Sequence, residues 1–243
     1  METKDSAQKI GFVFDLDGTL LDDVPFFITI PEKVAKIYQL EISDELNQQI
    51  KDEVMGILVG SGSNFLVFKV FLYIAKRYGL PWYKRLGFVK KVIQIYREDI
   101  GKCPLFPECE ETLDNLKSQY GPIGILTTSS LCEIDERFEG RRDFLDKFDD
   151  SVIGRDAVKK MKPNPEGILK LSQSWQIHPK RIIMVGDMWM DIEAGKKTGA
   201  LTIGVLTGFS SRGELETTKP DFILESIADL PSILPEIINK VGC

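Results

Sequence analysis

The chain has 243 residues, 43% hydrophobic and 28% charged, a composition ordinary for a soluble globular protein of one large domain or two modest ones. Its net charge of −6 argues against nucleic acid as the main partner. The four cysteines form no Cys-x-x-Cys pair and there is one histidine, which argues against a zinc site. No apolar run approaches the ~18–20 residues of a membrane span, and the polar N-terminus lacks the apolar stretch of a secretory signal. We therefore expect a cytoplasmic monomer or homodimer that binds neither nucleic acid nor membrane.

The first predicted element is a buried strand, "IGFVF" at residues 10–14, which continues directly into Asp15, Asp17 and Gly18. Alternate strand positions share a face, so the two carboxylates start out pointing the same way. Two like charges ~4 Å apart repel by about 4 kcal/mol at an effective dielectric constant of ~20. Either one carboxyl is protonated or a cation lies between them.

The segment from residue 24 to about 103 is predicted to be helical. Apolar residues recur at helical spacing from Leu46 to Val54, after Ser43 and an acidic pair, and again from Trp82 to Val89. About 80 residues without a convincing strand indicate a helical insert. We therefore expect one α/β domain formed by residues 1–23 and 104–243, with a helical domain over residues 24–103.

Short apolar runs recur in the second part of the chain, with helical segments between them. The pattern is typical of strands buried on both faces of a parallel sheet. The clear runs lie at 122–127, 181–186 and 201–205, and weaker ones lie at 151–154 and 221–224. Asn164 and Pro165 predict a helix start, with Asn164 as the N-cap.

Polar side chains that could take part in catalysis or ligand binding follow several of these strands. In open parallel sheets, ligands bind beyond the carboxyl ends of the strands, so these side chains should converge on one crevice. They are Asp15, Asp17, Thr127, Thr128, Lys162, Asp187 and Asp191.

Four ordered motifs carry a family resemblance: "DLDGT", "GILT", "KPNP" and "GDMWMD". In this order, from about residue 9 to residue 230, the chain resembles the haloacid dehalogenase (HAD) superfamily. The insert resembles the helical cap of its phosphoglycolate-phosphatase-like branch. The resemblance implies a Rossmann-like parallel sheet core with a small all-helical cap inserted after the first strand. The chain departs from the family pattern at Met188, Trp189 and Met190, and at Glu108, where a glycine is common.

The resemblance also implies a reaction centre. Asp15 is expected to be the nucleophile that forms an aspartyl-phosphate, and a carboxylate needs no base for this because it is already ionised at neutral pH. Mg²⁺ is expected on the side chains of Asp15 and Asp187 and the main-chain carbonyl of Asp17. The Asp17 side chain is then free to protonate the leaving oxygen and later to activate water.

The same resemblance assigns the phosphate contacts. Thr127, the amide of Thr128 and the Lys162 ammonium would hold the phosphate oxygens. Lys159 and Lys160 compete for the lysine role, but the following Pro-Asn-Pro selects Lys162. Asp191 would orient Lys162 or a metal-bound water.

The stretch "LVGSGSNFLVFKVF", residues 58–71, contains the candidate specificity residues. As a dinucleotide fingerprint it fails, because it follows a helix and lacks the third glycine. It resembles the glycine-containing loop of phosphoglycolate-type caps, which places Gly60, Ser61 and Gly62 at the substrate and Lys69 opposite a substrate carboxylate. A plain helix–helix loop and an exposed lysine are the alternatives.

The predicted function is that of a Mg²⁺-dependent phosphatase acting on a small phosphorylated metabolite, with phosphoglycolate the leading candidate. A phosphomutase of the β-phosphoglucomutase type is the alternative within the family, since it differs only in what resolves the aspartyl-phosphate. A 2-haloacid dehalogenase is disfavoured, because that branch lacks the second aspartate. A non-catalytic binding module with the same fold is the alternative from another class.

Overall fold

The computed structural model describes residues 9–60 and 66–241 of the chain. By its internal contacts the chain divides into two compact units. One unit consists of residues 1–22 and 104–243, and the other of residues 23–103. We call them the α/β unit and the helical unit and describe each by itself.

The α/β unit contains one six-stranded sheet in which each pair of neighbouring strands is parallel, in the order β3-β2-β1-β4-β5-β6. Each strand lies within a run that the sequence predicts, including the two weaker ones, so the predicted parallel sheet is confirmed. The strands are β1 (Gly11–Phe14), β2 (Ile123–Leu126), β3 (Val152–Ile153), β4 (Ile182–Gly186), β5 (Leu201–Val205) and β6 (Phe222–Leu224).

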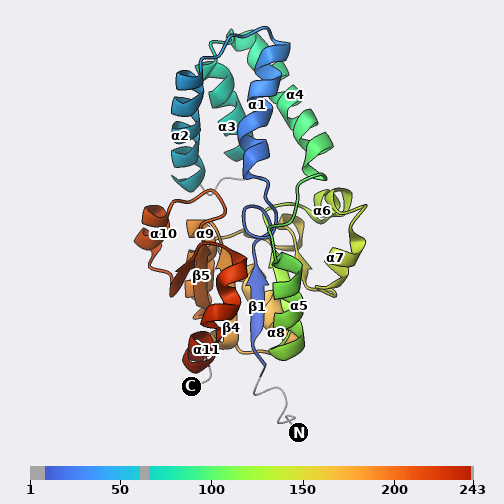
Figure 1. Cartoon of the computed structure of the whole chain (residues 1–243). Coiled ribbons are helices and arrows are strands. Elements are labelled where there is room, and N and C mark those ends of the chain that lie inside the picture. The colour runs from blue at the N-terminus through green and yellow to red at the C-terminus, as the bar shows by residue number, and fades with distance from the viewer. Residues whose placement is uncertain (1–8, 61–65, 242–243) are drawn as a thin grey trace. The chain divides into compact units, whose positions relative to one another are not determined.

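Helices cover both faces of this sheet, which explains why its central strands are apolar throughout. The four residues of β1 and the five of β4 are all buried. In Figure 1, α8 and α9 lie on one side of the sheet, and α5 and α11 lie on the other. The helices of this unit are α5 (Cys109–Gln119), α6 (Leu131–Arg137), α7 (Arg142–Asp146), α8 (Glu166–Trp175), α9 (Trp189–Thr198), α10 (Arg212–Thr218) and α11 (Leu230–Val241).

The strand order places a switch point between β1 and β4. From β1 the chain moves outward to β2 and β3, and it then returns to the other side of β1 for β4, β5 and β6. The connections after β1 and β4 therefore run in opposite directions, and in open parallel sheets ligands bind at the carboxyl ends of the strands at such a point. This is the edge of the sheet at which the sequence places its polar residues.

The helical unit consists of α1 (Val24–Ile37), α2 (Asp44–Gly60), α3 (Leu66–Arg77) and α4 (Trp82–Ile100), with no strand among its described residues. The expected start of α2 is confirmed, because the Leu46 amide donates to Ser43 Oγ at 3.2 Å. The apolar face predicted for α4 from Trp82 to Val89 is wrong at its start. Trp82 is 78% and Leu86 58% exposed, while Phe88, Val89 and Val92 are buried.

Among helices in the described ranges 9–60 and 66–241, none has both the length and the apolar character that crossing a bilayer requires.

Candidate active site

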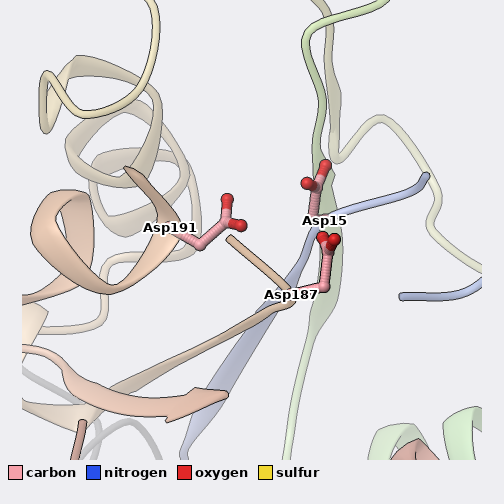
Figure 2. A group of neighbouring side chains, drawn as sticks. All are labelled: Asp15, Asp187 and Asp191. Atoms are coloured by element: carbon pink, nitrogen blue, oxygen red, sulfur yellow. The ribbon is translucent and has the colours of Figure 1, made fainter. Parts of the chain in front are cut away.

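Two aspartates leave neighbouring strands at the switch point. Asp15 directly follows β1 and Asp187 directly follows β4, and the Asp15 amide donates to the Val185 carbonyl at 2.9 Å, which ties the two strand ends together. Asp191 stands in the first turn of α9. Figure 2 shows the three side chains gathered at this end of the sheet, and an oxygen from each lies within 4.8 Å of the others. The predicted convergence of Asp15, Asp187 and Asp191 is therefore present in the structure.

The backbone near Asp187 is shaped for close approach. A Cβ atom at Gly208 would lie 1.9 Å from Asp187 Oδ2, so no larger residue fits there without a shift. The following amide, that of Phe209, donates to the same oxygen at 2.8 Å. Thr19 Oγ1 donates to the other oxygen at 3.4 Å. These contacts fix the orientation of a carboxylate that is fully buried.

Lys162 brings a single buried ammonium into this group. Its Nζ lies 2.9 Å from Asp15 Oδ1 and 2.6 Å from Asp191 Oδ1. The second oxygen of Asp191 accepts from the Met188 amide at 3.0 Å. Both Asp191 oxygens thus have partners within the protein, and the residue holds Lys162 in place.

Burial changes the proton affinity of these groups. Removal from water, with repulsion from Asp191 and Asp17, raises the pKa of Asp15 to about 7 even though Lys162 opposes the change. Burial, together with the charges of Asp15 and Asp191, raises the pKa of Asp187 well above its usual value. Burial alone would lower the pKa of Lys162, but Asp15 and Asp191 outweigh it and raise that pKa.

The donor set fits a hard divalent cation. The buried group of Asp15, Asp187 and Asp191 can carry three negative charges against one ammonium, so ionisation of all three leaves an excess of negative charge. Carboxylate oxygens are the ligands that Mg²⁺ prefers. Asp191 is paired with the Lys162 ammonium at 2.6 Å, whereas Asp187 accepts from the uncharged Phe209 amide and Thr19 hydroxyl. Asp15 and Asp187, which directly follow the two central strands, are therefore the side chains best placed to share a metal.

Asp17 belongs to a second polar group, which the sequence predicts only in part. Its Oδ2 accepts from Thr127 Oγ1 at 3.5 Å and from Ser129 Oγ at 3.4 Å. Its Oδ1 is paired with the guanidinium of Arg137, a buried side chain. The strand-end pair therefore does not share one protein cation: Asp15 pairs with Lys162 and Asp17 with Arg137.

The remaining predicted residues lie outside these groups or outside the described residues. Thr128 is exposed, and Lys159 and Lys160 are exposed with their amides bonded to Glu166. Lys69 is exposed on α3, and Gly60 is the last residue of α2. Ser61 and Gly62 lie outside the described residues. Of the unusual residues after Asp187, Met190 is buried, while Met188 and Trp189 are half-buried.

Four contacts at this site escape reasoning from the sequence: Thr19, the Phe209 amide, Ser129 and Arg137. The sequence offered a signal for two of them, because Thr19 is the last residue of the "DLDGT" motif and Ser129 lies two residues after the "GILT" motif. Arg137 and Phe209 had none, since they lie at the far end of a helix and in a distant loop.

Comparisons with known proteins agree with this geometry. Residues 12–205 match the family model described as haloacid dehalogenase-like hydrolase. The chain is 26% identical over 248 residues to a phosphoglycolate phosphatase of Shigella boydii, with 95% of each chain covered. The family match and this curated relative support a phosphatase.

Solved structures show the same fold. One, from Thermotoga maritima, is provisionally assigned as a β-phosphoglucomutase and has a TM-score of 0.75 at 22% identity, covering 93% of this chain and 99% of that chain. Another is a HAD family hydrolase of Deinococcus radiodurans R1 with bound phosphate and sodium. Its TM-score is also 0.75, at 19% identity, with 95% of this chain and 97% of that chain covered.

Proposed function

Because the chain belongs to the haloacid dehalogenase-like hydrolase family, we propose that it is a Mg²⁺-dependent phosphatase that forms an aspartyl-phosphate on Asp15. The substrate is a small phosphorylated metabolite, with phosphoglycolate first because the relative from Shigella boydii bears that name. The observation that carries the proposal is the buried group of Asp15, Asp187, Asp191 and Lys162 at the carboxyl ends of β1 and β4.

Asp15 and Asp187, with the main-chain carbonyl of Asp17, would hold the Mg²⁺. When bound, the ion supplies positive charge that neutralises both carboxylates and the phosphate oxygens. The raised pKa of Asp15, about 7, supports a role for a cation here. A nearby cation favours the ionised form of Asp15, which a nucleophile requires.

In the first half-reaction, a carboxylate oxygen of Asp15 attacks phosphorus while the bond from phosphorus to the leaving oxygen breaks. The side chain of Asp17 donates its proton to that leaving oxygen. Lys162 and Thr127 hold the phosphate oxygens, with the amide of Thr128 as a third donor. Asp191 keeps the Lys162 ammonium in place through the contact of 2.6 Å.

In the second half-reaction, water attacks the phosphorus of the aspartyl-phosphate. Asp17, now ionised, takes a proton from this water, and the bond between phosphorus and the Asp15 oxygen breaks. Inorganic phosphate leaves and Asp15 returns as a carboxylate, so each residue ends as it began. The same carboxyl thus acts first as acid and then as base.

A phosphomutase is the second candidate, favoured by the fold shared with the protein provisionally assigned as a β-phosphoglucomutase. Its first half-reaction would be the same. A sugar hydroxyl, rather than water, would then take the phosphoryl group from Asp15. The two candidates differ in their product, because only the phosphatase releases inorganic phosphate in proportion to substrate consumed.

The test is a phosphate-release assay on a panel of phosphorylated metabolites that includes phosphoglycolate and β-glucose 1-phosphate. We expect Mg²⁺-dependent release that stops in excess EDTA. Asp15→Asn should lose at least about a thousandfold in kcat while remaining folded, since an amide is a poor nucleophile. Activity within tenfold of wild type would contradict the nucleophile assignment. No turnover on any substrate would favour a non-catalytic binding module.

A further inference from the structure

The second polar group of the site places an arginine on the residue that transfers the proton. Asp17 Oδ1 is paired with Arg137, which in turn donates from its other terminal nitrogen to Ser129 Oγ at 3.1 Å. Ser129 Oγ donates to Asp17 Oδ2 at 3.4 Å. Arg137, Ser129 and Asp17 thus form a closed ring of contacts around one carboxylate.

We propose that Arg137 is a positioning residue for Asp17. It anchors Oδ1, so that Oδ2 is the oxygen that carries the proton between Asp17 and the leaving group. This inference rests on the proposed function, in which Asp17 is the acid and base. It adds a residue that no motif of the sequence marks.

The local fold explains how a residue ten positions beyond Thr127 reaches the site. Helix α6 starts beside the end of β2 with a capping box, in which the Ser130 amide donates to Glu133 Oε2 at 2.8 Å. Side chains of a helix lean toward its N-terminus. Arg137 is the last residue of α6, so its side chain points back toward the start of the helix and toward Ser129.

Burial makes this contact specific. The Arg137 side chain is 5% exposed and that of Asp17 19%, so water competes little for the pair. A planar guanidinium offers donors in a fixed fork, so it can bind a carboxylate oxygen and a neighbouring hydroxyl together. The ammonium of a lysine is a point charge and cannot reproduce this fork.

Stability alone is a weak reason for such a pair. A buried ion pair can often be replaced by apolar residues without loss, because removing two charges from water offsets their attraction. The proposal therefore predicts an effect on catalysis that is separate from any effect on folding. The rival role, a direct contact between Arg137 and the substrate phosphate, predicts a different pattern.

The experiment compares two substrates that differ in their need for a proton. Phosphoglycolate has a poor alkoxide leaving group, and p-nitrophenyl phosphate has a good one. Arg137→Met should lower kcat for phosphoglycolate by about tenfold to a hundredfold, within the range of general acid catalysis. It should lower p-nitrophenyl phosphate turnover by a clearly smaller factor, because this substrate needs Asp17 only as the base in the second half-reaction, and Asp17→Asn should give the same pattern. Arg137→Lys should recover part of the loss, because it keeps the charge but not the fork.

The double variant and the KM of Arg137→Met distinguish a positioning role from a direct contact with the phosphate. In the Asp17→Asn background, Arg137→Met should have no further effect on kcat, because Arg137 acts through Asp17. Equal losses on both substrates with a raised KM would place Arg137 on the phosphate and overturn the proposal. If Arg137→Met lowered kcat in the Asp17→Asn background by as much as it does in the wild type, the proposal would be overturned as well.

Arg142→Met is the matched control, since Arg142, on α7, forms an exposed ion pair with Asp135 of α6, and its loss should leave both substrates unaffected. If Arg137→Met does not fold, Arg137→Lys carries the test, and unchanged kcat on both substrates would overturn the proposal. A wild-type protein that hydrolyses neither substrate would contradict the proposed function itself. A wild-type enzyme with an unaffected Arg137→Met variant would contradict only the role of Arg137.

Discussion

Asp187 couples the charge of the site to the stability of the α/β unit. Its pKa is raised well above the ordinary value, and that of Asp15 is raised from 3.8 to about 7. A carboxyl that binds its proton more tightly in the folded state stabilises the protein at low pH and loses this contribution as pH rises through the folded pKa. The metal-free protein should therefore lose stability between about pH 4 and pH 8, and Mg²⁺ should restore it most at the upper end.

Asp187→Asn tests this coupling without an activity assay. In EDTA at pH 8 the variant should melt a few degrees above wild type, because 1 kcal/mol corresponds to about 2–4 °C at this size and the amide carries no charge. The difference should shrink toward pH 5. Differential scanning calorimetry at the two pH values gives the answer. A variant less stable than wild type by the same amount at both would mean that the contacts with Phe209 and Thr19 outweigh the charge.

At the scale of secondary structure, the start of α5 shows a departure from the family that has a physical cost. Glu108 precedes the helix with φ of 59°, a left-handed conformation that glycine adopts without strain. Its side chain is exposed. This backbone conformation would suit the glycine that the family resemblance predicts at this position, and the glutamate is strained there.

Glu108→Gly should stabilise the chain by about 0.5–1 kcal/mol. Relief of ~1–2 kcal/mol of left-handed strain exceeds the ~0.5–1 kcal/mol that glycine loses in unfolded-state entropy. Glu108→Ala is the control, because it removes the charge and keeps the strain, and it should be less stable than the glycine variant. Urea unfolding at neutral pH measures both. Equal stability of the two variants would show that the conformation carries no cost here.

The strands and the helices differ in how well the sequence predicts them. Continuous apolar runs bounded by polar residues mark each strand, because a parallel strand is buried on both faces. Helix details depend on packing that a periodic pattern does not specify, so Trp82 and Leu86 are exposed although they continue the spacing of Val89. The start of α8 also differs slightly from the prediction. Pro165, not Asn164, occupies the N-cap, while Asn164 Oδ1 accepts from the Glu166 amide at 3.0 Å.

At the scale of the whole molecule, the sequence predicts the buried carboxylates around Lys162 better than the second polar group, which surrounds Asp17. Asp15 and Asp187 are predictable because parallel strands bring their carboxyl ends to one edge of the sheet. The role of Arg137 cannot be predicted in this way, since its contact with Asp17 depends on the length of α6 and on the direction of one side chain. The hydrogen bond from the Phe209 amide to Asp187 cannot be predicted either, because every residue type except proline offers the same backbone donor.

Substrate choice remains a prediction that involves the other unit. Lys69 lies in α3 of the helical unit and is exposed, whereas the buried carboxylates belong to the α/β unit. The resemblance to phosphoglycolate-type caps predicts that Lys69 binds the carboxylate of phosphoglycolate. A charge-assisted contact of this kind contributes about 1.5–3 kcal/mol, which is about tenfold to over a hundredfold in kcat/KM.

Lys69→Met should therefore lower kcat/KM strongly for phosphoglycolate and leave p-nitrophenyl phosphate nearly unchanged, because that substrate has no carboxylate. Lys76→Met is the matched control, since Lys76 is also exposed on α3 and should affect neither substrate. Steady-state kinetics with both substrates and both variants decides the matter. Equal losses on the two substrates would assign Lys69 a supporting role in the helical unit. No loss on either would place Lys69 in solvent and leave the recognition of phosphoglycolate to other residues.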